Sequence, residues 1–478
     1  MFKHARVLAP LLVAALLGAC DDEAVNPPTA AAGAMFARYI ALGNSITAGF
    51  QSGGIDSTTQ NQSYAVLLAN SMGTTFIIPK LAGQGCPPLF SNIFTQERTS
   101  AVPCAVRTDE IPEFINLVAI PGAAVIDVFS NFDPASGPNT LTTVLGGGHT
   151  QLQNAAMVRP TFVTVWIGNN DALGAVLTVG NAGDPSLVTD PGTFATRYTA
   201  MMDSLDALGS IQGGVLIGVV QVALAPYLTQ GRVWKGFELG FDAQVQAQFD
   251  AAFAATVAGL VAAGILPPIP TVENATLTTL GINANFFDVD LNCLANQPLT
   301  ATDTAWASVP FHMGGPILSA ASAGAADPTA GANLITFGVD SLVRILNPAA
   351  PAPNVAMLPT PTVMDCSVAD AVTATEATNL FASVSAFNAT IEAEADERGW
   401  VYIDPNDLLR QLAQDTSAIR PFPAFPGTAS NDATLNTPFG SALSLDGIHP
   451  SASVHRSLAS VLIVAINAAY SSSIPALQ

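Results

Sequence analysis

The feature that most constrains the fold is the alternation of short, almost wholly apolar segments with longer stretches of helical periodicity. Phe162–Ile167 is apolar or β-branched at every position, as is typical of a strand buried on both faces. Val215–Val222 has a similar character. Ala371–Arg398 carries a long helical period that stops at Gly399, and Trp400–Ile403 follows as a strand candidate. Strands that alternate with helices predict a parallel α/β sheet covered by helices on both faces.

Other segments extend this pattern, and one region interrupts it. From about residue 225 to 370 the alternation fails, with one helix candidate at Ala243–Ala263 and loops rich in Pro, Gly and Ala. We interpret this region as a large insertion into the second half of a domain spanning residues 35–478. The remaining candidates are strands at Phe36–Leu42 and Thr75–Pro79, and helices at Ser63–Ser71 and Ser457–Ala469.

The charge balance excludes one class of partner. The 478 residues include 15 Lys and Arg against 36 Asp and Glu, for a formal net charge of −21. Nucleic-acid affinity depends on basic side chains that neutralise phosphates, and this chain is strongly acidic. We therefore expect no nucleic-acid partner.

The first residues resemble a bacterial lipoprotein signal. Lys3 and Arg6 precede the apolar run Val7–Gly18, which is too short to span a membrane permanently. Small residues then lead to Cys20, as in a lipobox. The sequence predicts a signal peptide over residues 1–19, lipidation of Cys20, and a Pro- and Ala-rich tether over residues 20–34. An ordinary cleaved signal peptide is the alternative. The expected location is the bacterial cell envelope, on the periplasmic or outer-membrane side.

The other four cysteines predict disulfides. An even number of cysteines in an exported chain favours pairing, and four cysteines allow three arrangements. Proximity along the sequence favours Cys86–Cys104 and Cys293–Cys366. There is no CxxC motif or Cys/His cluster, so we expect no metal site.

Four short segments carry residue types suited to catalysis. Gly43-Asn44-Ser45-Ile46 places a serine just after a predicted strand, where ligand sites form in α/β sheets. Gly122 follows an apolar run and Pro121, and glycine lets the backbone approach a ligand closely. Asn170 lies in the polar segment that closes the Phe162–Ile167 strand. Asp446-Gly447-Ile448-His449 places a carboxylate one turn from an imidazole, which it can orient as a base.

Each segment has a simpler structural interpretation when taken alone. Ser45 can cap the following helix, and Gly122 can serve a plain turn. Asn170 can form an Asx turn, and the Asp446 segment can be a polar surface turn. It is the combination and the chain order of the four that favour a catalytic interpretation.

Together the four segments resemble the signature blocks of the SGNH (GDSL-type) hydrolase family, in the order in which that family carries them. The first block departs conservatively, with Asn44 and Ile46 where the family pattern has Asp and Leu. The resemblance extends over about residues 36–225 and 371–470. It implies a flavodoxin-like three-layer α/β/α sandwich with a parallel sheet of about five strands, interrupted here by the insertion.

The resemblance also implies an activity and its residues. A triad of Ser45, His449 and Asp446 would hydrolyse carboxylic acyl esters, as a lipase or esterase, through an acyl-enzyme. Ser45 would be the nucleophile, His449 the general base, and Asp446 the residue that orients it. The backbone N–H groups of Ser45 and Gly122 and the side-chain amide of Asn170 would form the oxyanion hole. No metal or organic cofactor is needed.

Weaker candidates and alternative functions remain. His312 and Ser322 faintly mimic the active-site motifs of α/β-hydrolase lipases, but no buried strand leads into Ser322. His149 and His455 fit loop and packing roles. The expected substrate is a lipid or small acyl ester. The alternatives are a carbohydrate O-acetyl esterase or acyltransferase on the same fold, and a non-catalytic binding lipoprotein that retains the scaffold.

Overall fold

A computed structural model describes most of the chain. The described residues are 32–93, 96–102, 104, 114–130, 141–264, 278, 287–312, 362–420, 422 and 437–477. Cys20, the signal segment at 1–19 and most of the tether lie outside these residues, as does Ser322.

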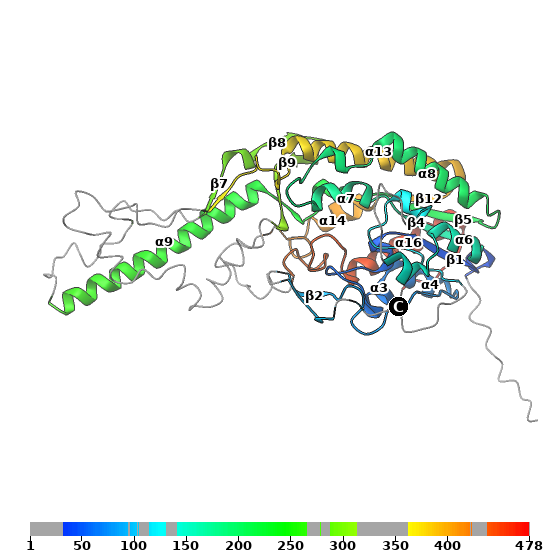
Figure 1. Cartoon of the computed structure of the whole chain (residues 1–478), viewed down its shortest axis with the longest axis horizontal. Helices are drawn as coiled ribbons and strands as arrows, with labels where there is room; N and C mark the ends of the chain where they lie inside the picture. The colour runs from blue at the N-terminus through cyan, green and yellow to red at the C-terminus, as the bar shows by residue number, and fades with distance from the viewer. Residues whose placement is uncertain are drawn as a thin grey trace, which may run out of the picture.

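The centre of the molecule is a parallel four-stranded sheet in the order β1-β4-β5-β12 (Figure 1). Its strands are β1 (Tyr39–Gly43), β4 (Phe162–Trp166), β5 (Gly213–Ile217) and β12 (Val401–Ile403). Every residue of the first three is buried, as expected for parallel strands covered on both faces. The mixed α/β class predicted from the alternating pattern is therefore confirmed, with four named strands.

A further segment lies along the outer edge of β1. Ala41 forms an isolated parallel bridge with Leu117. The N–H of Val118 donates to Ala41 and that of Ile120 donates to Gly43. This segment occupies the position that a fifth strand would take. The predicted strand at Thr75–Pro79, by contrast, is a loop whose Ile77 hydrogen-bonds with Asn116.

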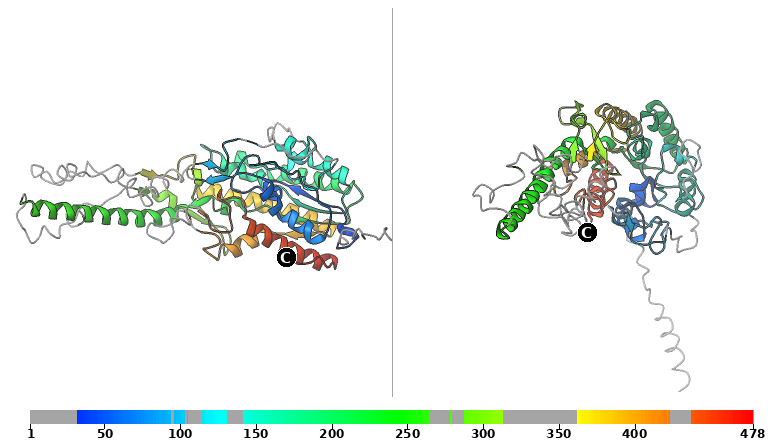
Figure 2. Two further views of the ribbon diagram at one scale, coloured as in Figure 1. Left: turned by 90° about the horizontal axis from the view of Figure 1, so that it is seen from below. Right: turned by 60° about the vertical axis from the view of Figure 1, so that its left-hand side comes forward.

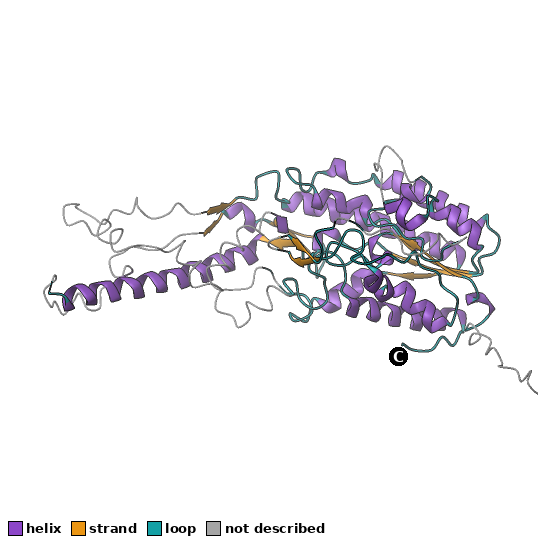
Figure 3. Ribbon diagram, turned by 60° about the horizontal axis from the view of Figure 1, so that its bottom comes forward, coloured by secondary structure: helices purple, strands orange, loops and turns teal. Residues whose placement is uncertain are grey.

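Helices pack on both faces of the sheet (Figures 1 and 3). α4 (Tyr64–Met72) packs against α16 (Ala452–Tyr470), and α8 (Pro191–Asp206) packs against α13 (Ala374–Arg398). Two stacked rings, Phe194 of α8 and Phe387 of α13, lie 4.1 Å apart between these helices. The other helices are α2 (Ser45–Ala48), α3 (Ser57–Gln62), α5 (Leu141–Gly146), α6 (Gln151–Val158), α7 (Asn170–Leu177) and α14 (Pro405–Leu412).

Of the described residues, those of α16 form the one helix long and apolar enough to cross a membrane. Its residues Leu458, Leu462 and Ile466 are buried in the core. Core helices of globular proteins share these properties, so this helix carries no argument for a membrane span.

The insertion contributes a long helix and several short strands. α9 (Gly231–Ala262) begins 12 residues before the helix expected at Ala243 and extends away from the sheet (Figure 2). β6 (Leu228–Gln230) pairs with β10 (Ser308–Pro310), and β7 (Phe287–Val289) pairs with β11 (Thr362–Met364). Short antiparallel pairs are also formed by β8 (Asn296–Pro298) with β9 (Thr304–Trp306), and by β2 (Phe90–Asn92) with β3 (Glu97–Arg98).

Both predicted cysteine pairs lie at bonding distance. The sulfur atoms of Cys86 and Cys104 are 1.91 Å apart, and those of Cys293 and Cys366 are 1.99 Å apart. The second pair joins a turn after β7 to the chain just beyond β11. It therefore ties together the two ends of the larger part of the insertion.

Candidate active site

The three predicted triad residues form one continuous hydrogen-bonded chain. His449 Nε2 lies 2.9 Å from Ser45 Oγ, and His449 Nδ1 lies 2.8 Å from Asp446 Oδ2. If the Nδ1 proton lies toward the carboxylate, Nε2 is free to accept the serine proton. All three side chains are largely buried but retain some exposure, between 7% and 9% of each residue.

Ser45 lies at a sharp turn between strand and helix. β1 ends at Gly43, the Asn44 side chain accepts the N–H of Ile46, and α2 begins at Ser45. A Cβ atom at Gly43 would lie 2.7 Å from the Trp166 carbonyl oxygen, so the close approach of β1 and β4 here requires glycine. The nucleophile candidate therefore stands at the carboxyl edge of the sheet.

Gln151, which the sequence did not single out, holds this turn together with residues at the start of α4. The Gln151 side chain bonds both backbone groups of Gly43, at 2.9 Å each. Ser63 Oγ donates to the Thr47 carbonyl, and the Thr47 and Tyr64 hydroxyls are 2.9 Å apart. Gln151 lies 108 residues from Gly43, and nothing in its local pattern marks the contact.

The Asp446 carboxylate is held by five hydrogen-bond partners. Oδ1 accepts from Ser444 Oγ and from the N–H groups of Ile448 and His449, while Oδ2 binds His449 Nδ1 and the Gly53 N–H. Burial by itself raises the pKa of Asp446. The attraction of His449 and these hydrogen bonds outweigh it and hold the pKa below the ordinary range. Asp446 is therefore an ionised partner for a histidine that gains a proton.

The predicted oxyanion-hole groups come from three adjacent segments at the same sheet edge. Among the described residues, the N–H groups of Ser45 and Gly122 have no acceptor. Gly122 has φ 82°, a left-handed conformation that favours glycine. Asn170 Nδ2 donates to the Ala123 carbonyl at 2.9 Å, which uses one of its two N–H bonds and leaves the other for a ligand.

Asp171 lies in the polar segment that the sequence singled out, and the structure gives it a positioning role that the sequence did not assign. Its Oδ2 accepts the N–H of Val125 and its Oδ1 accepts the Thr189 hydroxyl, both at 2.9 Å. It thereby attaches the turn containing Gly122 to the start of α7, next to Asn170. Burial raises the pKa of Asp171 to about 6.

The remaining histidines differ from His449. His455 is fully buried, accepts the Tyr64 N–H at Nδ1, and has its pKa lowered to about 3 by burial and by His449 nearby. His312 Nδ1 lies 3.0 Å from the Tyr227 hydroxyl, and the His149 N–H closes a turn onto Gly146. Among the described histidines, His449 alone contacts both a carboxylate and a serine at hydrogen-bond distance.

The insertion contacts the loop that carries Asp446 and His449. The Tyr227 N–H donates to the Gly447 carbonyl, and the Phe311 N–H donates to the Tyr227 carbonyl. The Phe311 and Phe439 rings are 5.4 Å apart, and Phe439 packs against Gly447. The insertion therefore supports the segment between Asp446 and His449.

Three comparisons with known proteins found no match: no family model, no curated protein and no solved structure is similar to this chain.

Proposed function

We propose that this protein is a serine hydrolase of carboxylic acyl esters with the SGNH hydrolase fold. The observation that carries the proposal is the hydrogen-bonded chain from Ser45 through His449 to Asp446. A serine hydroxyl is a weak nucleophile without a base, and this geometry supplies one within reach.

The proposed mechanism assigns each group one role. Ser45 Oγ attacks the ester carbonyl carbon while His449 Nε2 takes the hydroxyl proton, and the C–O bond to the leaving alcohol breaks as His449 returns that proton. A water molecule then gives a proton to the same base and attacks the acyl carbon, and the bond to Ser45 Oγ breaks as His449 returns the proton to that oxygen and the carboxylic acid leaves. Throughout, the carboxylate of Asp446 stabilises the imidazolium. The N–H groups of Ser45 and Gly122 and the Asn170 amide would stabilise the negative charge on the tetrahedral intermediates.

An apolar cavity beside the triad supports an acyl substrate. It has a volume of about 70 Å³ and is lined by Ile46 and Ile448, the chain neighbours of Ser45 and His449, together with Trp166, Leu443 and Val454 among others. Apolar walls favour burial of hydrocarbon by about 0.8 kcal/mol per methylene group. A cavity of this size suits a short acyl chain.

We also propose that the protein is exported and attached to the cell envelope through lipid on Cys20. The two cysteine pairs at bonding distance support an oxidising compartment.

The experiment that tests the hydrolase proposal is activity of the full chain on a series of p-nitrophenyl esters from acetate to octanoate, with Ser45→Ala as the control. We expect turnover of the shorter esters by the parent and none above background by the variant. Equal turnover by the two proteins would contradict the proposal.

A further inference from the structure

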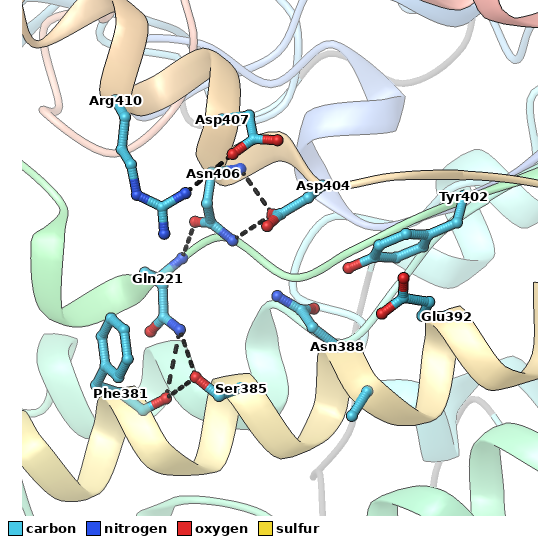
Figure 4. Close-up of a pocket in the computed structure, with 11 residues that line it drawn as sticks. Gln221, Phe381, Ser385, Asn388, Glu392, Tyr402, Asp404, Asn406, Asp407 and Arg410 are labelled. Carbon is cyan, nitrogen blue, oxygen red and sulfur yellow. Dashed lines mark hydrogen bonds and ion pairs between the residues drawn. The ribbon is translucent and has the colours of Figure 1, made fainter. Parts of the chain in front are cut away.

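A polar pocket opens at the far end of the sheet edge that carries the triad. Its volume is about 550 Å³, within the usual range for small-ligand sites. Gln221 follows β5, Asp404 follows β12, and Asn388 lies on α13 (Figure 4). Because β5 and β12 are the strands farthest from β1, this pocket is distinct from the triad.

The wall of the pocket is fixed by side-chain amides. Asn388 bonds both backbone groups of Val219, at 2.6 and 2.9 Å. Asn406 accepts the Gln221 N–H and donates to the Val219 carbonyl and to Asp404. These contacts hold the segment after β5 rigidly in place, as binding sites require.

Two buried polar atoms at the pocket lack partners. Gln221 is only 3% exposed, and its Nε2 donates to Ser385 and to the Phe381 carbonyl, but its Oε1 has no partner. Arg410 bonds Asp407 and Asp303 through its terminal nitrogens, while its buried Nε has none. Both atoms are closed to solvent in this conformation, so the accessible groups of the lining decide what the pocket can bind.

The remaining lining groups define the chemistry of that ligand. Glu392 offers carboxylate acceptors at the open side. Burial and then the nearby carboxylates of Asp404, Glu392 and Asp407 raise the pKa of Tyr402, so its hydroxyl stays protonated. No hydrogen bond is found for this hydroxyl among the described residues.

The pocket therefore needs both donors and acceptors from its ligand, without net charge. A cation would be repelled by the partly exposed guanidinium of Arg410. An anion would be repelled by three carboxylates. Hydroxyl groups both donate and accept, and so can pair with the Tyr402 hydroxyl, the Glu392 carboxylate and the Arg410 guanidinium.

A second hollow continues the pocket and shares Asn406 and Arg410 with it. It has a volume of about 360 Å³ and is lined on its other side by Trp306, whose ring lies 4.8 Å from the Arg232 guanidinium. An aromatic ring offers a flat apolar surface beside polar groups. Two adjoining hollows suit a ligand made of at least two linked rings, with one ring in each hollow.

We propose that this groove binds a neutral oligosaccharide, with one sugar residue against Gln221 and Tyr402 and the next toward Trp306. The inference concerns binding alone and does not rest on the ester chemistry proposed for Ser45.

The test is isothermal titration calorimetry of the full chain with cellobiose, xylobiose, maltose and chitobiose. We expect at least one of them to bind with a Kd of about 1 mM or tighter. Tyr402→Phe and Glu392→Gln should each weaken that binding about five- to tenfold, because the first removes a hydroxyl and the second replaces a charged acceptor oxygen with an amide donor. Glu397→Gln, an exposed change on the same helix outside the pocket, should leave binding unchanged.

Defined outcomes would overturn the inference. These are the absence of binding by all four disaccharides, binding that is unaffected by Tyr402→Phe and Glu392→Gln, or binding of spermidine or inorganic phosphate in place of the sugars. Because the readout is heat of binding, loss of ester hydrolysis in Ser45→Ala has no bearing on it.

Discussion

The Gly53 N–H donates to Oδ2 of Asp446 at 2.7 Å, although the two residues are 393 positions apart in the sequence. The same oxygen atom accepts the hydrogen bond from His449 Nδ1. The loop after α2 therefore helps to orient the carboxylate that orients the proposed base. The two ends of the domain are therefore joined at the candidate site.

The first prediction concerns this carboxylate. Asp446→Asn should lower kcat by about 10²–10⁴ with little change in KM, because an amide cannot stabilise the imidazolium and can favour the wrong tautomer. Steady-state kinetics on p-nitrophenyl acetate measures the effect. Asp396→Asn, an exposed change on α13, is the control. Retention of full activity in Asp446→Asn would exclude Asp446 from the mechanism.

The second prediction concerns the oxyanion hole. Asn170→Ala should lower kcat by about 10²–10³, as for the loss of one donor to the oxyanion. KM should change little, since the donor acts mainly on charge that develops in the transition state. A variant whose KM rises while kcat is unchanged would show that Asn170 binds the substrate and does not stabilise the oxyanion.

The third prediction uses the raised pKa of Asp171. A buried acid whose folded-state pKa is about 6, against about 3.9 unfolded, contributes stability below about pH 4 that is lost as the pH rises through 6. The loss amounts to roughly 3 kcal/mol at most. Asp171→Asn should remove this component from the urea-unfolding free energy measured between pH 4 and 8. An unchanged pH slope would contradict it.

The fourth prediction concerns the apolar cavity. Val454→Phe should fill it and lower kcat/KM for butyrate relative to acetate about tenfold, because two methylene groups lose burial worth about 0.8 kcal/mol each. Val461→Phe places the same ring on the exposed side of the same helix and should not alter chain-length preference. Superimposable profiles for the parent and Val454→Phe would place the acyl chain elsewhere.

The fifth prediction concerns export. Lipidation through two or more acyl chains gives stable membrane attachment, so Cys20→Ser should release soluble or unprocessed protein. Membrane fractionation followed by immunoblotting measures this. Unchanged membrane association of the variant would reject lipidation of Cys20.

Local patterns predicted much of the fold. The buried β4 strand and the long α13 helix were recognisable because their apolar period and end signals are local. The early start of α9 was missed because Gly231, Gly236 and Gly240 weaken its helical pattern. Thr75–Pro79 resembles a strand in composition, but only its Ile77 bonds the segment at Asn116 and Leu117, and no regular ladder forms along it.

Only the site residues that belong to short sequence motifs could be predicted. Ser45, Asn170, Asp446 and His449 stand in recognisable blocks, and the structure brings Ser45, His449 and Asp446 into contact. Asp171 stands in the same block as Asn170, but its contact with Val125 could not be predicted, and nothing in the local pattern of Gln151 indicates its contact with Gly43. The polar pocket at Gln221 also could not be predicted, because residues from three separate segments line it.

The central claim is that Ser45 is the nucleophile, and covalent labelling tests it most directly. The full chain is treated with a fluorophosphonate, digested, and analysed by mass spectrometry. We expect one modified serine, Ser45, and no labelling of Ser45→Ala, while Ser322→Ala should be labelled like the parent. Modification of Ser322, or undiminished labelling of Ser45→Ala, would contradict the account.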